Sequence, residues 1–217
     1  MGTVIITGAG SGLGKALAKQ YASAGYKIYL TGRGEEKLRL TQLEINEQGG
    51  DAETILCDIT EHASVIEMLK QVNEVDVLIN NAGLGIFGPL SDYREEDINV
   101  MLDTNVKGTI LLTQEAQQKL EASGGRVLNI ISTAGLKGKT NETVYCATKF
   151  AVRGFTESLH KEWEDTSIDA TAVYMGGMNT PFWDNSDHIS NPENLKTPEE
   201  VAKTIFEQDD RRPEIRI

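Results

Sequence analysis

Short apolar runs alternate with helical patterns along the whole chain. The spacing Leu13, Ala16, Leu17, Tyr21 and Ala24 predicts one face of a helix, and the same kind of spacing recurs over residues 65–72 and 98–120. Around these helices, runs rich in β-branched residues predict strands. These runs are Thr3–Thr7, Lys27–Thr31, Glu53–Cys57, Asp76–Asn80, Arg126–Ser132, Asp169–Met175 and Glu214–Ile217.

This alternation predicts the fold class. Strands that are joined by helices pair in parallel, with right-handed crossovers. Continuous apolar strands such as Val77-Leu78-Ile79 are typical of a sheet that is covered on both faces. We therefore predict a single doubly wound α/β domain over residues 1–217, with a mostly parallel seven-stranded sheet and helices on both faces. A length of 217 residues favours one domain over two.

The segment before the last helix lacks such a pattern. Thr197-Pro198-Glu199-Glu200 predicts a helix start, with a capping Thr, Pro at the first helical position and a Glu that completes a capping box. The preceding residues, 180–196, are polar and without period, and their length suggests a binding loop. Phe182 and Trp183 in this loop, together with Phe87, are candidates for the wall of an apolar substrate pocket. Ordinary packing of loop aromatic residues is the alternative.

Charge and composition exclude several classes of function. The chain has 33 acidic and 21 basic residues and a formal charge of −12, so its surface repels nucleic acid. Cys57 and Cys146 fit two reduced thiols, and the three histidines have no metal-ligand spacing, so we expect no metal site. No run approaches the roughly 18 apolar residues of a membrane span. We expect a cytoplasmic protein without membrane or nucleic-acid partners.

A glycine-rich turn follows the first strand and opens the first helix. Glycines allow a tight turn and close approach of the backbone to a ligand, and the free amides of a helix start attract anions. At the first crossover of such a fold, this arrangement favours a dinucleotide pyrophosphate, although a purely structural turn is the alternative. The candidate contacts are Gly8, Gly10, Ser11, Gly12, Leu13 and Gly14.

The end of the second strand predicts which dinucleotide binds. NAD sites usually place an acid at this position to bond the ribose hydroxyls, but here the chain reads Gly32-Arg33. A guanidinium binds a phosphate in a bidentate manner. We therefore predict NADP(H) as the cofactor, with Arg33 at its 2′-phosphate. The alternative is a solvated Arg33 that balances Glu35 and Glu36.

Tyr145 and Lys149 form a candidate catalytic pair. Their spacing of four residues places both on one helix face. A phenol has an ordinary pKa of about 10, and we expect the nearby ammonium and a bound oxidised nicotinamide to lower it. Such a tyrosine serves as general acid or base. Ser132, at the carboxyl end of the fifth strand run, would face the ligand crevice and bond a substrate oxygen. Alone, a Tyr/Lys pair is usually a surface feature.

Together, these motifs resemble those of the short-chain dehydrogenase/reductase family, in its main non-extended branch. The match includes the turn Thr7–Gly14, the motif Asn80-Asn81-Ala82-Gly83, Asn105, Ser132 and the pair Tyr145 and Lys149, in the family's order and at its intervals. The resemblance covers nearly the whole chain. It implies a Rossmann-type fold and an enzyme that works with a nicotinamide cofactor.

The resemblance also implies roles for individual residues. Tyr145 would be the catalytic acid/base, Ser132 would orient the substrate carbonyl, and Lys149 would lower the pKa of the tyrosine and bond the nicotinamide ribose. Asn105 would hold a water that links Lys149 to a proton relay. Further cofactor contacts would come from three segments: Asp58 and Ile59 at the adenine, Asn81, Ala82 and Gly83 at the adenosine ribose, and Met178 and Thr180 at the nicotinamide.

The predicted function is transfer of a hydride between NADP(H) and a carbonyl or secondary alcohol. Met175 replaces the proline that the family usually has after the sixth strand, so the turn beneath the nicotinamide would be less rigid. Two other functions remain open: an NADP(H) sensor or scaffold with little turnover, and an isomerase or epimerase that uses the same Tyr and Lys. By resemblance, the helices around 102–120 and 145–163 would form the interface of a homodimer or homotetramer.

Overall fold

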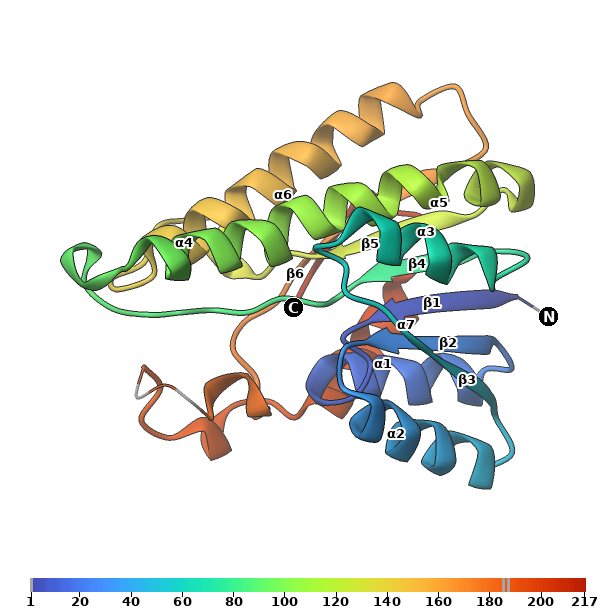
Figure 1. Cartoon of the computed structure of the whole chain (residues 1–217), viewed down its shortest axis with the longest axis horizontal. Coiled ribbons are helices and arrows are strands. Elements are labelled where there is room, and N and C mark those ends of the chain that lie inside the picture. Colours follow the sequence, from blue (N-terminus) through green and yellow to red (C-terminus); the bar gives the residue numbers. More distant parts are fainter. Residues whose placement is uncertain (1, 185, 187) are drawn as a thin grey trace.

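The computed structural model describes residues 2–184, 186 and 188–217, and in this part of the chain seven parallel strands form one sheet (Figure 1). The strand order is β3-β2-β1-β4-β5-β6-β7, so the predicted doubly wound α/β fold is confirmed. The strand bounds agree with the predicted runs to within two residues. They are β1 Thr3–Thr7, β2 Lys27–Gly32, β3 Asp51–Leu56, β4 Val77–Asn80, β5 Arg126–Ile130, β6 Asp169–Tyr174 and β7 Glu214–Arg216.

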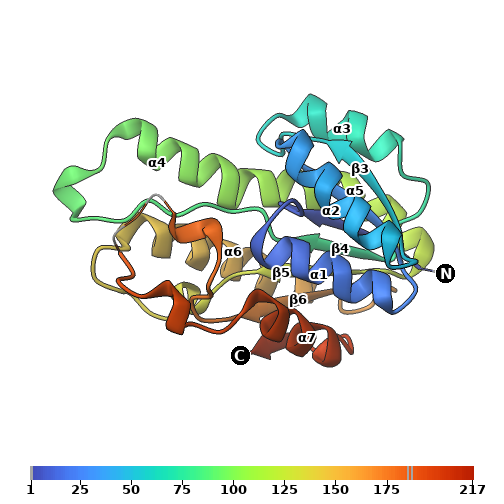
Figure 2. The same ribbon diagram turned by 90° about the horizontal axis from the view of Figure 1, so that it is seen from below.

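Helices cover both faces of the sheet (Figures 1 and 2). The bounds are α1 Gly12–Ser23, α2 Glu35–Glu47, α3 His62–Lys70, α4 Glu95–Leu102, α5 Thr109–Ser123, α6 Thr143–Glu162 and α7 Pro198–Gln208. Helices α1, α2 and α7 pack on one face, and α3, α5 and α6 on the other. Within the described residues, no helix is both long enough and apolar enough to cross a membrane.

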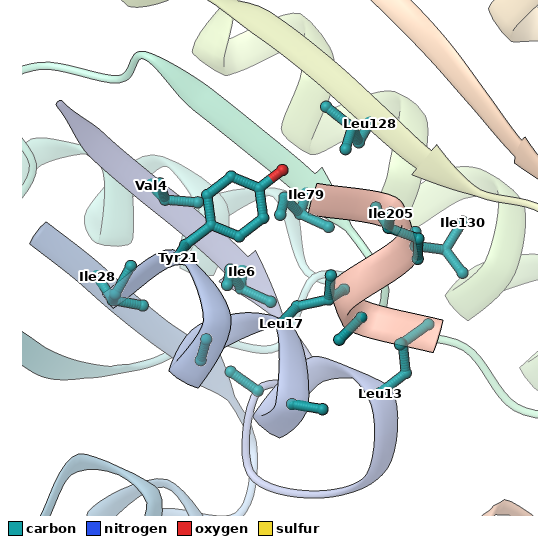
Figure 3. Packing of buried hydrophobic residues seen from close by; sticks show 14 of the residues in the cluster. Val4, Ile6, Leu13, Leu17, Tyr21, Ile28, Ile79, Leu128, Ile130 and Ile205 are labelled. Atoms are coloured by element: carbon teal, nitrogen blue, oxygen red, sulfur yellow. The ribbon is translucent and has the colours of Figure 1, made fainter. Parts of the chain in front are cut away.

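Alternate residues along the strands point into two separate hydrophobic cores, one on each face of the sheet. Val4 and Ile6 of β1 point toward α1, whereas Ile5 between them belongs to the core under α3 and α5. Figure 3 shows Leu13, Leu17 and Tyr21 of α1 lying over these strands, beside Ile205 of α7. Burial of each such side chain contributes about 1.5–3 kcal/mol. Ala24 is not part of this face, because α1 ends at Ser23 and Ala24 is exposed.

Between α4 and α5 the helix widens into a π-helical segment, Asp103–Gly108. This segment corrects the prediction of one continuous buried face from Ile98 to Leu120. A π turn inserts an extra residue, so the faces before and after it do not align. Met101 is fully buried, whereas Leu102, which the simple helical spacing placed inside, is 42 % exposed.

The connection before α7 is irregular over its described residues, and its role as a binding loop stays a prediction. Among its described residues there are two short 3₁₀ helices, Pro181–Trp183 and Pro192–Asn194. Met178 and Lys196 form an isolated parallel bridge where the connection begins and ends. Thr197 caps α7 by accepting the Glu200 amide, and the Glu200 carboxylate accepts the Thr197 amide, which confirms the capping box.

Candidate active site

The glycine turn between β1 and α1 is built for close contact. Gly8 and Gly12 have φ values of +65° and +51°, a left-handed conformation that favours glycine. A Cβ at Gly14 would lie 2.3 Å from the Gly8 carbonyl oxygen, so only glycine lets α1 start this close to β1. The first turn of α1 carries no acidic side chain. Its amides are therefore suited to an anionic ligand.

Most of the predicted site residues line one cleft. The cleft has a volume of about 390 Å³ and lies at the carboxyl ends of β1, β2, β4 and β5, running from the glycine turn to Ser132, Tyr145 and Lys149. In doubly wound sheets this edge holds the ligands. Of the predicted residues, Gly10, Gly14, Asn105 and the candidate wall residue Phe87 do not line the cleft. Gly10 packs against α2, where a Cβ would lie 2.9 Å from Cβ of Lys37.

Asn105 lies behind the cleft wall, in the π-helical segment. Its Nδ2 donates to the Leu84 carbonyl oxygen at 2.8 Å and to Oγ1 of Thr148 at 3.1 Å, and its Oδ1 accepts from the Leu84 amide at 2.9 Å. The side chain thus fixes the backbone of Leu84, which lines the cleft. π segments often occur where a helix serves a functional site. The bound water that the resemblance implies for Asn105 stays a prediction.

Ser132 lies just beyond β5 in a strained conformation. Its φ of +85° is rare for a residue with a Cβ, and such a residue costs on the order of 1–3 kcal/mol unless its surroundings hold it in place. The Ser132 amide donates to the Val173 carbonyl oxygen at 3.3 Å, and its Oγ accepts from the Ala134 amide at 3.3 Å. The buried hydroxyl also acts to lower the pKa of Tyr145. Strain at this position favours a functional role.

Tyr145 and Lys149 lie on the same buried face of α6. The Lys149 Nζ is 5.7 Å from the centre of the Tyr145 ring and donates to the Ile130 carbonyl oxygen at 2.9 Å. Burial lowers the pKa of Lys149 to about 8. Burial also raises the pKa of Tyr145 above its ordinary value, although the Ser132 hydroxyl partly offsets this. The predicted lowering of the Tyr145 pKa concerns the protein with an oxidised nicotinamide bound and stays a prediction; without the cofactor, burial raises this pKa.

At the other end of the cleft, Arg33 has a second cation beside it. The Arg33 Nη1 lies 3.8 Å from Oδ2 of Asp58, and Lys37 from the first turn of α2 lines the same space. Burial raises the pKa of Asp58, but hydrogen bonds from Thr60 and the charges of Arg33 and Lys107 bring it below its ordinary value. The sequence reasoning missed Lys37, and the signal that could have found it is its place in the helical turn after Arg33.

An aromatic cluster stands beside Tyr145. The rings of Phe87 and Phe182 lie 5.4 Å and 5.9 Å from the Tyr145 ring, and Trp183 stacks on Phe87 at 5.4 Å. Phe182 and Trp183 line the cleft, as expected for the wall of an apolar substrate pocket. Lys139 and Glu142 also line it. The sequence reasoning missed both, and only their closeness to Tyr145 along the chain could have indicated them.

This geometry agrees with the comparison to known families. The model of the short chain dehydrogenase family matches residues 2–190. The chain belongs to this family. An uncharacterized oxidoreductase of Staphylococcus epidermidis is a short-chain dehydrogenase relative with 32 % identity over 188 residues, covering 84 % of this chain and 80 % of that protein. The predicted family resemblance is therefore confirmed, and the protein is an oxidoreductase of the short-chain dehydrogenase family.

Two further short-chain dehydrogenase relatives cover most of both chains. Sepiapterin reductase of Chlorobaculum tepidum is 32 % identical over 216 residues, which are 94 % of this chain and 88 % of that protein. An alcohol dehydrogenase from the archaeon Thermococcus sibiricus, solved in complex with 5-hydroxy-NADP, superposes with a TM-score of 0.91 at 26 % identity. That match covers 100 % of this chain and 96 % of the other.

Proposed function

We propose that the protein is an NADP(H)-dependent oxidoreductase that interconverts a carbonyl compound and a secondary alcohol, with Tyr145 as general acid and base. The observation that carries the proposal is the cleft itself. Ser132, Tyr145 and Lys149 line the same cleft as the glycine turn, so one bound dinucleotide would reach from the turn to the phenol. A Tyr/Lys pair on an exposed helix surface would not share a cleft with a glycine turn in this way.

The residues present fit an NADP cofactor. The glycine turn supplies backbone amides for the pyrophosphate, and Arg33 and Lys37 supply two positive charges at the end of β2 for a 2′-phosphate. The hydroxyl of Thr104 lines the cleft and is buried without a hydrogen-bond partner among the described residues. Such a group favours a polar ligand beside it. The relative from Thermococcus sibiricus, solved with 5-hydroxy-NADP, supports this choice.

When bound, NADPH supplies the hydride that adds to the carbonyl carbon. The hydroxyls of Ser132 and Tyr145 donate hydrogen bonds to the carbonyl oxygen and stabilise the negative charge that develops there. Tyr145 then transfers its proton to that oxygen. Its raised pKa keeps the phenol protonated at neutral pH, as a general acid requires. Lys149, with a pKa of about 8, is mostly charged at that pH and stabilises the phenolate that remains.

The wall of the pocket indicates an apolar substrate. Phe182 and Trp183 line the cleft, Phe87 packs on both of them, and Tyr145 faces the same cluster. Aromatic rings bind apolar groups through area burial and favourable ring contacts. We therefore propose a small carbonyl compound with an apolar substituent next to the carbonyl carbon.

A screen of turnover tests this function. Purified protein is mixed with NADPH or NADH and a panel of ketones and aldehydes, and the loss of cofactor absorbance is followed. We expect turnover of at least one apolar ketone, with a preference for NADPH. Tight NADPH binding without turnover of any member would contradict the proposal and favour the sensor or scaffold function.

The family resemblance also predicts a homodimer or homotetramer. Exposed apolar side chains occur along the helices that the family uses for subunit contacts: Val100, Leu102, Ile110 and Phe150. Light scattering on the purified protein tests this expectation, and a mass near 23.8 kDa would contradict it. A cytoplasmic location stays a prediction.

A further inference from the structure

Glu142 is a buried acid beside the catalytic residues that the proposed mechanism does not use. It directly precedes α6, three residues before Tyr145, and its side chain is only 8 % exposed. One carboxylate oxygen, Oε1, accepts a hydrogen bond from Nε2 of His188 at 2.9 Å. The other, Oε2, lies 3.7 Å from Nζ of Lys139. A carboxylate this far from water needs such partners, so His188 is held to the start of α6.

His188 in turn supports the aromatic residues of the pocket. Its ring stacks on Phe87 with a centroid distance of 4.6 Å and an interplanar angle of 16°, and it lies 6.2 Å from the Trp183 ring. Phe87 packs edge to face on Tyr145 at 5.4 Å. Glu142, His188 and Phe87 thus form a continuous series of contacts that ends at the catalytic phenol. We call Phe87, Phe182 and Trp183 the aromatic wall.

We infer that Glu142 and His188 are positioning residues for the substrate, and that the hydrogen bond between them holds the aromatic wall against Tyr145. This inference rests on the proposed function, because it assigns the wall to substrate binding. Neither side chain needs to touch the reacting atoms. The His188 ring contacts the rings of Phe87 and Trp183, and Phe87 in turn contacts the Tyr145 ring.

The role predicts a specific kinetic signature. A wall that binds the apolar part of the substrate contributes equally to the bound substrate and to the transition state. Its loss therefore raises KM and leaves kcat unchanged. A purely structural role would instead lower the fraction of folded protein or change kcat and KM together.

His188→Phe is the sharpest variant, because it keeps a ring that can stack on Phe87 and removes the hydrogen bond to Glu142. We expect the KM for a reduced ketone to rise about tenfold, the effect of roughly 1.4 kcal/mol of lost binding free energy, with kcat changed by less than about twofold. Glu142→Leu removes the same hydrogen bond from the other side, together with the contact to Lys139 and a negative charge near Tyr145. The double variant is expected to have the same KM as Glu142→Leu alone, because the hydrogen bond to His188 is already absent there. Glu193→Leu, at an exposed carboxylate of the same connection, should behave like the parent protein.

A second readout is independent of activity. In a Trp163→Phe background, Trp183 is the remaining tryptophan and reports the aromatic wall directly. Acrylamide should quench its fluorescence more strongly in His188→Phe and Glu142→Leu than in the parent or in Glu193→Leu. Unchanged quenching, an unchanged KM in a protein that turns over, or additive effects in the double variant would overturn the inference. If no ketone is reduced by the parent protein, the proposed function fails, and the quenching result still decides whether Glu142 and His188 hold the wall.

Discussion

Buried polar groups form a paired cluster at the amino end of the sheet, whereas at its carboxyl end they are desolvated or strained. At the amino end, the Asp209 carboxylate is 1 % exposed and accepts two hydrogen bonds from Arg126 and one from the Tyr21 hydroxyl. At the carboxyl end, the buried Lys149 amine donates a hydrogen bond to the Ile130 carbonyl oxygen, and Ser132 has a strained backbone. β5 spans the two ends, with Arg126 at its start and Ser132 just past its end.

The difference separates polar groups that stabilise the fold from polar groups whose burial or strain lowers its stability. Paired groups at the amino end connect α1, β5 and the end of α7, and they do not line the cleft. At the carboxyl end, a buried amine, a strained serine and the Thr104 hydroxyl, which has no hydrogen-bond partner among the described residues, each cost free energy, and all three residues line the cleft. Such costs are retained where they serve function. Variants at the two ends should therefore affect stability with opposite signs.

The largest effect on stability is expected from Asp209→Ala. It leaves the guanidinium of Arg126, which is 13 % exposed, without its carboxylate partner. Removing one member of a buried pair costs about 3–5 kcal/mol. Urea unfolding measures the loss, and turnover per folded molecule should not change. Asp210→Ala, at an exposed neighbour paired with Arg212, is the matched control and should cost less than about 1 kcal/mol. Equal losses in the two variants would refute the role of the buried cluster.

Lys149→Met should show the opposite sign, in a manner that depends on pH. The pKa of Lys149 falls from its ordinary 10.5 to about 8 on folding. Between these values the unfolded chain holds a proton that the folded protein has released, so the free energy of unfolding of the parent rises with pH from about 8 to 10.5. The rise is on the order of 3 kcal/mol.

The Met variant lacks this contribution. Compared with the parent, it should therefore be relatively most stable near neutral pH and lose that advantage as the pH rises from 8 toward 10.5. Urea unfolding at several pH values measures the difference. Lys161→Met, at an exposed lysine of the same helix, is the matched control and should change the free energy of unfolding by less than about 0.5 kcal/mol. A flat difference for Lys149→Met would show that the amine is not desolvated by folding.

The smallest of these effects is expected for Arg33→Ser. Arg33 is 65 % exposed, and Lys37 remains nearby to share the phosphate. The kcat/KM for NADPH should fall about tenfold, or roughly 1.4 kcal/mol, while that for NADH stays the same. Stability should not change. Arg39→Ser, at an exposed arginine of α2 outside the cleft, serves as the control. An equal loss of kcat/KM with both cofactors would mean that Arg33 does not bind the 2′-phosphate.

Much of this molecule could be predicted from the sequence because the signals are local or repeated. The alternation of strands and helices follows from periodicity, and the capping box at Thr197 depends on four consecutive residues. Gly8 and Gly12 lie in the turn that needs their left-handed conformation. Ser132 could be placed at the ligand edge because carboxyl ends of parallel strands meet there, and Tyr145 and Lys149 were joined to it through the family resemblance.

The remaining features depend on contacts that no local pattern records. Leu102 is exposed although its spacing looks helical, and a π segment begins directly after it. The raised pKa of Tyr145 follows from the depth of its burial, which the sequence pattern of residues 145–152 does not predict. The bond between Glu142 and His188 joins residues 46 positions apart. Each of these required the packed structure.

The most direct test of the central claim is Tyr145→Phe, assayed for turnover of a ketone and for NADPH affinity. The phenol is the proton donor in the proposed mechanism, and the bulk of its ring is kept in phenylalanine. We predict that kcat falls about 10²–10⁴-fold, while the dissociation constant of NADPH changes by less than about threefold. Turnover close to that of the parent protein would contradict the account.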